Sequence, residues 1–201
     1  MNAEKCLQIL REIKDVAFAT VENGLPQVRI IDVMLVENKK LYFCTARGKY
    51  FYNQLITNGN VAVTGLNKKY QMVRLKGRAK KLDDNKKWID RIFESNPSMN
   101  AVYPDDSRYI LEAFIIDNGS IEFFDLGIKP INRQYFTLGK VIEECKGFFI
   151  SDKCIRCGKC TRSCPQQCIE IGVPYMIHQE HCLHCGLCAE ICPVNCIVKK
   201  G

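Results

Sequence analysis

Apolar side chains recur along the first two thirds of the chain with two different periods. Between residues 3 and 13 they follow helical spacing behind Asn2, a good N-cap residue, which predicts a helix that ends near Lys14. Farther along, apolar runs of strand length alternate with turn-forming residues. The predicted strands span residues 16–21, 27–36, 41–45, 61–66, 70–81, 112–117 and 121–126.

Turns and short helices connect these strands. Asn23-Gly24 and Asn118-Gly119 predict tight turns, and the second would join the last two strands in a hairpin. Residues 50–57 and a segment that begins at Asp83 or Asp84 predict helices. Antiparallel strands with inserted helices favour a small barrel over a parallel βαβ sheet. The fold class we expect is therefore α+β.

Composition and charge narrow the class of protein. Of 201 residues, 47% are hydrophobic and 25% charged, which suits a globular core and argues against disorder. No apolar run approaches the roughly 18–20 residues of a membrane span, and no secretory signal opens the chain, so we expect a cytoplasmic protein without a membrane partner. The net charge of +7 suits an anionic ligand or an acidic partner. No basic run interleaved with aromatic residues predicts nucleic-acid binding.

Cysteines divide the chain into two zones. Ten of the thirteen fall between Cys154 and Cys196, and only Cys6, Cys44 and Cys145 lie outside that stretch. An odd number without an export signal disfavours a disulfide framework. We therefore expect a barrel domain at residues 1–127, a linker at 128–147 and a small cysteine-rich domain at 148–201.

The cysteine-rich domain is an internal repeat. Every cysteine of the first copy recurs 28 residues later, and both copies read C-x2-C-x2-C-x3-C-P-x2-C-I. The first copy holds Cys154, Cys157, Cys160, Cys164 and Cys168, and the second holds Cys182, Cys185, Cys188, Cys192 and Cys196.

This spacing is typical of iron–sulfur ligation. Three thiolates two residues apart wrap one [4Fe–4S] cluster, while the cysteine before proline ligates the other cluster. Cluster one is therefore predicted on Cys154, Cys157, Cys160 and Cys192. Cluster two is predicted on Cys182, Cys185, Cys188 and Cys164. Zinc is the alternative, but zinc ribbons use paired C-x2-C knuckles. These residues resemble a bacterial two-cluster [4Fe–4S] ferredoxin, over residues 148–200.

The repeat leaves over two cysteines and three histidines. We expect Cys168 and Cys196 to be small buried apolar residues rather than ligands. The histidines are expected to have surface or hydrogen-bonding roles, and they are His178, His181 and His184.

Three strand segments of the first domain resemble a second family. Residues 27–31 read QVRII, residues 41–49 read LYFCTARGK and residues 71–79 read QMVRLKGRA. Their order is similar to that of the pyridoxamine 5′-phosphate oxidase-like, FMN-binding split-barrel family, over residues 5–127. The resemblance implies a mainly antiparallel split β-barrel with flanking helices, ahead of the ferredoxin-like domain. It also implies an FMN cofactor and a homodimer with flavin at its interface.

The resemblance assigns roles to individual residues. The flavin phosphate is a dianion, and Arg29, Arg47 and Lys49 supply matching cations. Thr45 would meet the isoalloxazine edge, and the strand backbone at Arg29, Ile30 and Ile31 would flank the ring. Gln71 would bond a flavin or ribityl oxygen from the other subunit. Cys44 is the last residue predicted to line the cofactor site. It stands where the family often has other residues, and we expect its thiol to be inert. These positions complete the predicted cofactor site.

One departure from the family concerns the substrate. The oxidases that act on pyridoxamine phosphate use an Arg-rich C-terminal segment, and residues 131–147 contain no clear match. Pyridoxamine phosphate is therefore not the expected substrate. No catalytic acid or base stands out either.

The two domains together predict an electron-transfer function. FMN handles hydride and single electrons, whereas [4Fe–4S] clusters pass one electron at a time. We expect an oxidoreductase that passes electrons between two clusters and FMN, and on to or from a small molecule or protein partner. One alternative is a non-catalytic electron carrier or redox-sensing module whose barrel binds a partner. Another is a barrel that holds a deazaflavin or haem. The donor, the acceptor and the direction of flow stay open.

Overall fold

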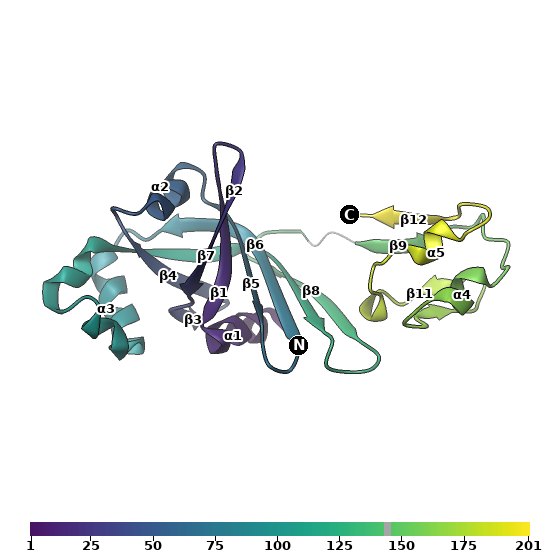
Figure 1. Cartoon of the computed structure of the whole chain (residues 1–201), viewed down its shortest axis with the longest axis horizontal. Helices are drawn as coiled ribbons and strands as arrows, with labels where there is room; N and C mark the ends of the chain where they lie inside the picture. The colour runs from purple at the N-terminus through teal and green to yellow at the C-terminus, as the bar shows by residue number, and fades with distance from the viewer. Residues whose placement is uncertain (143–145) are drawn as a thin grey trace. The chain divides into compact units, whose positions relative to one another are not determined.

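The structure is a computed structural model that describes residues 1–142 and 146–201 (Figure 1). Cys145 and part of the predicted linker lie outside these residues. The chain divides into two compact units. The barrel unit comprises residues 1–123 and 135–142, and the cysteine-rich unit comprises residues 124–134 and the described residues from 146 to 201.

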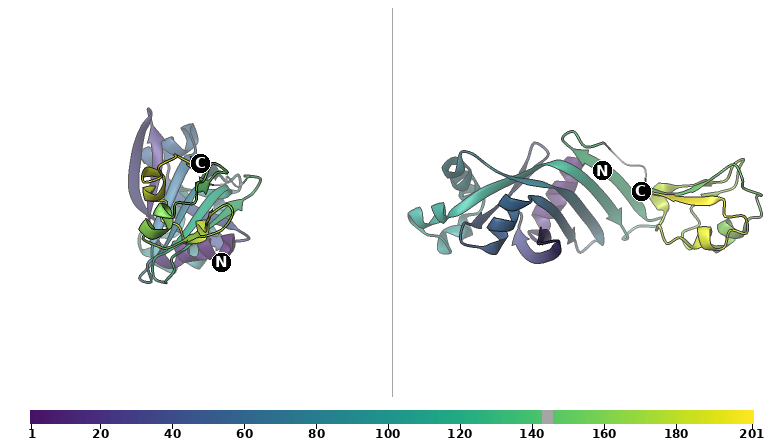
Figure 2. Two further views of the ribbon diagram at one scale, coloured as in Figure 1. Left: turned by 90° about the vertical axis from the view of Figure 1, so that its right-hand side faces the viewer. Right: turned by 90° about the horizontal axis from the view of Figure 1, so that it is seen from above.

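One sheet forms the barrel unit's framework, as Figures 1 and 2 show. It has eight strands. Its order is β2-β1-β5-β6-β7-β4-β3, and β8 pairs with β7. The pairs β1–β2, β1–β5, β5–β6, β3–β4 and β4–β7 are antiparallel. The strands are β1 (Asp15–Glu22), β2 (Leu25–Asp32), β3 (Leu35–Glu37), β4 (Lys40–Ala46), β5 (Asn60–Leu66), β6 (Gln71–Lys81), β7 (Leu111–Asp125) and β8 (Asn132–Leu138).

The first helix closes the main core. Helix α1 spans Ala3–Ile13, and the Asn2 side chain accepts a hydrogen bond of 2.8 Å from the Lys5 backbone N–H, as the N-cap prediction requires. Its buried face, with Leu7 and Leu10, packs against β3 and β5. The core beneath it is centred on Phe18, Phe43 and Phe114, whose rings lie within 5.5 Å of one another in successive pairs.

A second, smaller core lies under the third helix, whereas Phe51 and Leu55 of the second helix belong to the main core. Helix α2 spans Tyr50–Thr57 and helix α3 spans Asn85–Ser95, with Asp84 as the N-cap of α3. The 3-10 segments η1 (Pro97–Ala101) and η2 (Asp105–Ile110) follow α3. Ile89, Ile92 and Phe93 of α3 pack with Met34, Leu111 and Ala113.

The predicted hairpin at Asn118-Gly119 is wrong. Residues 111–125 form the single strand β7, and the dipeptide lies inside it. The reason is tertiary pairing with β6: a Cβ atom on Gly119 would lie 2.2 Å from the Lys76 carbonyl oxygen. Glycine is therefore needed here for close backbone approach, which a turn signal cannot distinguish from a turn. Two further differences are that the predicted strand 27–36 splits into β2 and β3, and that the predicted linker contains β8.

The cysteine-rich unit repeats its backbone as well as its sequence. Residues 28 apart share left-handed conformations: Arg156 and His184 have φ of 56° and 57°, and Gln167 and Asn195 have φ of 49° and 50°. In this unit β9 pairs with β12, and β10 with β11. Its elements are β9 (Gly147–Ile150), α4 (Lys159–Ser163), β10 (Ile169–Glu170), β11 (Met176–Ile177), η3 (Gln179–His181), α5 (Leu187–Glu190) and β12 (Ile197–Lys200). None of the helices in the described part of the chain is both long and apolar enough to cross a membrane.

Candidate functional site: two cysteine-lined cavities and a barrel cavity

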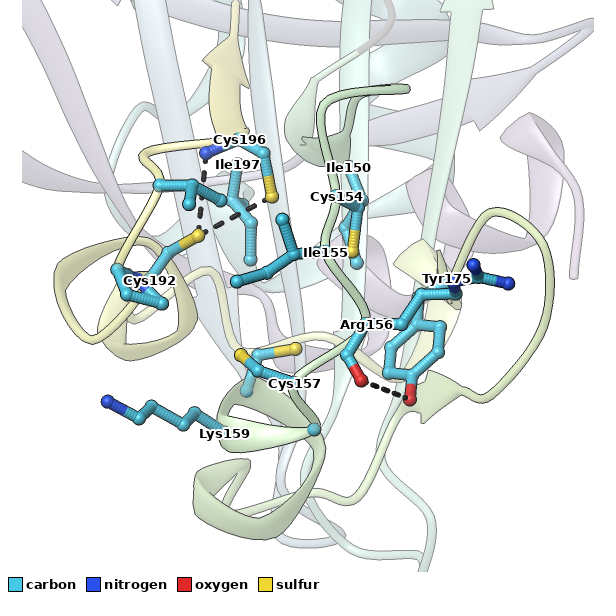
Figure 3. A pocket seen from close by; sticks show the side chains of 14 residues that line it. Ile150, Cys154, Ile155, Arg156, Cys157, Lys159, Tyr175, Cys192, Cys196 and Ile197 are labelled. Atoms are coloured by element: carbon cyan, nitrogen blue, oxygen red, sulfur yellow. Dashed lines mark hydrogen bonds between the residues drawn. The ribbon is translucent and has the colours of Figure 1, made fainter.

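The first cluster cavity gathers four cysteines from both copies of the repeat. Cys154 and Cys157 come from the loop that leads into α4, Cys160 lies in α4, and Cys192 follows α5. All four line one cavity, and Figure 3 shows sulfur atoms facing its centre. The structure thus brings together the set predicted for cluster one.

The second cluster cavity repeats this arrangement with the copies exchanged. Cys182, Cys185 and Cys188 line it together with Cys164. Gly158 and Gly186 begin the two short helices with φ of 70° and 85°. Glycine adopts this left-handed conformation without the strain that a side chain adds.

The thiols of each cavity surround a volume larger than a single metal-ion position. Among residues 1–142 and 146–201, no three His, Cys, Asp or Glu side chains are grouped to hold a single metal ion. Four thiols around a cavity suit a cluster with one thiolate per iron, so the donor set fits [4Fe–4S]. The second cavity also favours the thiolate, because a hydrogen bond from Cys168, helped by the backbone N–H of His184 and the charge of Arg133, lowers the pKa of Cys182 to about 6.

Cys168 and Cys196 lie beside the predicted ligands. Both are buried, with 4% and 3% of their surfaces exposed, and each lines one cluster cavity. The Cys168 sulfur lies 3.6 Å from that of Cys164, and the Cys196 sulfur lies 3.4 Å from that of Cys192. The pKa of Cys196 is raised to about 12, mainly by burial and next by a hydrogen bond to Cys192. This thiol therefore stays protonated at neutral pH.

The barrel cavity collects six of the eight residues predicted for the cofactor. It has a volume of about 410 Å³ and opens between β2, β4 and the start of α2. The six are Arg29, Ile30, Ile31, Cys44, Thr45 and Lys49. Phe51, Met99 and Tyr103 also line it and were not predicted. Phe51 could have been found from its place two residues after Lys49, whereas the segment with Met99 and Tyr103 shows no periodic pattern.

Arg29 is held in place from the barrel side. Its guanidinium donates to Thr20 Oγ1 at 2.6 Å and to Gln54 Oε1 at 2.8 Å, and it lies 4.5 Å from the centre of the Phe51 ring. Since a guanidinium has five N–H donors, these two bonds leave donors for an anion in the cavity. Lys49 adds a second cation to the same lining.

Thr45 and Cys44 contribute unused groups to this cavity. The buried Thr45 hydroxyl has no hydrogen-bond partner within the described chain. An unpaired buried hydroxyl is costly, so a ligand that bonds it is stabilised. Burial raises the pKa of Cys44 to about 12, which keeps its thiol protonated at neutral pH. The lining therefore fits a ligand that carries both an anionic group and a hydrogen-bonding ring edge, as FMN does.

Two predicted residues lie outside the barrel cavity. Arg47 donates to Tyr109 O at 2.8 Å and to Glu112 Oε1 at 3.0 Å, and this carboxylate also pairs with Lys81. Gln71, at the start of β6, accepts a hydrogen bond of 3.0 Å from Asn67 Nδ2. Neither residue lines the barrel cavity of its own chain.

Comparison with known families accounts for both units. Residues 3–110, more than half of the chain, match the family model described as pyridoxamine 5′-phosphate oxidase. The chain belongs to the pyridoxamine 5′-phosphate oxidase family. Residues 153–196 of this family member also match the 4Fe-4S dicluster domain. Both resemblances inferred from the sequence are confirmed, as is the α+β split barrel followed by a ferredoxin-like domain. A search of curated protein sequences finds no match.

Solved structures resemble the barrel of this oxidase-family protein. A NimC/NimA family protein from Clostridium acetobutylicum is 27% identical with a TM-score of 0.58, over 68% of this chain and 92% of that one. A protein from the same organism, related to general stress protein 26 of B. subtilis, is 17% identical with a TM-score of 0.51, over 67% and 95%. General stress protein 26 from Bacillus anthracis is 18% identical with a TM-score of 0.51, over 69% and 100%. The last two show the fold alone.

Proposed function

We propose that this protein is a cytoplasmic oxidoreductase that passes electrons between two [4Fe–4S] clusters and a bound FMN. It exchanges those electrons with a redox partner protein or a small molecule. The observation that carries the proposal is that one chain holds both kinds of site. Two cavities are each lined by the four cysteines predicted to hold one cluster, and a third is lined by Arg29, Lys49 and the unpaired Thr45 hydroxyl.

Each set of side chains has a defined task in this proposal. The eight thiolates hold the clusters, four in each cavity. Arg29 and Lys49 bind the FMN phosphate, and Thr45 donates to or accepts from the ring edge. When bound, FMN supplies both one-electron and two-electron chemistry. Cys44 remains a neutral thiol in the lining, because its pKa is about 12.

A homodimer completes the proposal. Strand β2 lies at one edge of the sheet, and Leu25, Val28 and Ile30 on it are 65%, 73% and 64% exposed. Val28 and Ile30 share one face of the strand, and exposed apolar side chains gathered on one face mark an interaction surface. A second copy that covers β2 would also explain how Gln71 and Arg47, which lie outside their own chain's cavity, could act on flavin.

Anaerobic purification tests the cofactor content. We expect about eight irons, about eight sulfides and about one FMN per chain, since four irons belong to each cluster. The mass and visible spectrum of the extracted organic cofactor distinguish FMN from a deazaflavin or haem.

Rapid mixing tests the electron path. A reduced one-electron donor, supplied at less than one equivalent, is mixed with the full chain and with a Cys164→Ala/Cys192→Ala variant that lacks a ligand for each cluster. We expect flavin reduction through the clusters in the full chain and a rate at least tenfold lower in the variant. Equal rates, or clusters that reduce while flavin stays oxidised, would refute the function.

A further inference from the structure

The two copies of the cysteine repeat differ in charge. Four basic residues stand directly before or between the predicted ligands of the first copy, at Lys153, Arg156, Lys159 and Arg162. The positions 28 residues later hold His181, His184, Leu187 and Glu190. With Asp152 included, residues 151–164 carry a net charge of +3, whereas residues 179–192 carry −2 with histidines neutral. The backbone repeats, but the charge does not.

The basic side chains of the first copy face solvent. All four are exposed, and Arg156 and Lys159 belong to the lining of the first cluster cavity. In Figure 3, Lys159 extends away from the sulfur atoms. Arg162 donates to the Cys157 carbonyl at 3.3 Å, which anchors its guanidinium across the loop. We call residues 151–164 the basic loop.

The corresponding part of the second copy is partly covered. The His181 ring nitrogen Nδ1 lies 2.8 Å from the Ile131 carbonyl, and Arg133 donates to the Cys182 carbonyl at 3.2 Å. Both contacting residues belong to the 124–134 segment of the same unit. The second cysteine of each copy, Cys157 or Cys185, is exposed to solvent. The copies therefore differ in their charge and in the contacts made by residues 124–134, and not in the exposure of this cysteine.

Apolar residues accompany the charges of the basic loop. Ile155 is 59% exposed and Val194 is 38% exposed, and both line the first cluster cavity. Apolar contacts inside a charged rim are the usual anatomy of a protein–protein interface. A free anion would use the cations alone, so this pattern favours a protein surface.

We propose that the basic loop is the docking surface for an acidic one-electron carrier protein, which exchanges electrons with cluster one. This inference rests on the proposed function. One electron leaves the reduced carrier and enters cluster one, with no bond made or broken. Opposite charges steer the encounter, so complex formation weakens as salt rises. The second copy, with its net negative charge, does not attract the same partner.

Charge reversal in the full, cluster-loaded chain tests the docking surface. The probe is an acidic flavodoxin of defined sequence, and the variant is Lys153→Glu/Lys159→Glu. A matched control, Lys68→Glu/Lys69→Glu, makes the same change in net charge on the turn between β5 and β6. Calorimetry gives the dissociation constant between oxidised proteins, and stopped flow gives the rate of cluster reduction by the reduced flavodoxin.

We expect the basic-loop variant to weaken binding and slow reduction about tenfold at low salt, with the difference lost at high salt. The control should stay within about twofold of the unaltered chain. Equal losses in both variants, salt-independent rates, or undiminished binding in the basic-loop variant would overturn the proposal. So would slower reduction of the variant by a small neutral reductant, because that result would mean damage to cluster one. Preferential binding of duplex DNA to the loop would also overturn it.

The outcomes separate this inference from the function on which it rests. If flavin is absent or is never reduced, the proposed function fails, while binding and cluster reduction still report on the loop. If the loop variants bind like the unaltered chain and cluster-to-flavin transfer persists, only the docking proposal fails.

Discussion

The Thr45 hydroxyl is a sensitive residue-scale probe of the barrel cavity, because it is buried without a partner. Thr45→Val removes only this hydroxyl and keeps the side-chain shape. We expect the flavin-free protein to become about 1–3 kcal/mol more stable, since the change removes a buried hydroxyl without a partner and loses no hydrogen bond. The affinity for FMN should fall about tenfold, which fluorescence titration of the flavin-free protein measures.

Thr64→Val is the matched control for this substitution. The Thr64 hydroxyl donates to the Val73 carbonyl at 3.1 Å and does not line the barrel cavity. This variant should lose about 0.5–1 kcal/mol of stability and keep its FMN affinity. An unchanged affinity in Thr45→Val would show that the hydroxyl does not contact flavin.

Cys44 offers a pH-dependent test at the same scale. Because burial raises its pKa to about 12, the reactive thiolate is a small fraction that grows about tenfold per pH unit up to that value. Alkylation of Cys44, followed by peptide mass spectrometry, should therefore accelerate from pH 7 to pH 10 without levelling off. A plateau near pH 9 would indicate an ordinary, exposed thiol.

Elements were predicted well where side-chain pattern and local signals agree. The Asn2 cap, the α1 face and the bounds of α2 follow from the sequence, because they depend on neighbouring residues. Gly119 was misassigned, since its role depends on Lys76 more than forty residues away. The barrel cavity also combines residues that local motifs predict with residues that they do not. Motifs predict Arg29 and Lys49, whereas Met99 and Tyr103 reach the cavity through tertiary packing.

Gly119→Ala tests the close approach of β6 and β7. The added methyl group would lie 2.2 Å from the Lys76 carbonyl oxygen, so the strands must separate. We expect a loss of about 2–3 kcal/mol in the free energy of unfolding, measured with denaturant. Gly48→Ala is the control, because nothing lies within 4 Å of its added Cβ, and its effect should be below about 0.5 kcal/mol.

Val28→Asp tests the edge strand β2 as the dimer interface. A charge at a residue that is 73% exposed costs little in one chain but is unfavourable once a second copy covers it. Light scattering should show the dimer dissociation constant raised at least tenfold. Val102→Asp, at a residue that is 66% exposed in the same unit, should leave the dimer intact. A monomeric parent chain would contradict the interface.

For the whole molecule, crossed ligation predicts how paired cysteine losses combine. Cys154 and Cys192 line the same cavity although they belong to different copies of the repeat. Cys154→Ala/Cys192→Ala should therefore remove one cluster and leave about four irons per chain. Cys154→Ala/Cys164→Ala removes a ligand from each cavity and should leave almost none.

Iron analysis of anaerobically purified variants measures both outcomes. Cys168→Ala serves as the control with about eight irons, because Cys168 is not in either predicted ligand set. The reverse pattern, with the first double variant iron-free and the second half-loaded, would mean that each copy ligates its own cluster.

Cysteines make up four of the nine buried core residues of the cysteine-rich unit. The barrel core is separate and dominated by aliphatic and aromatic side chains. If the proposed clusters are lost to oxygen, we therefore expect the cysteine-rich unit to lose its packing and the barrel unit to keep its own. A protease would then cleave the unfolded cysteine-rich unit and leave the barrel unit intact. Exposure to air would thus produce a shorter protein that is still yellow from its flavin.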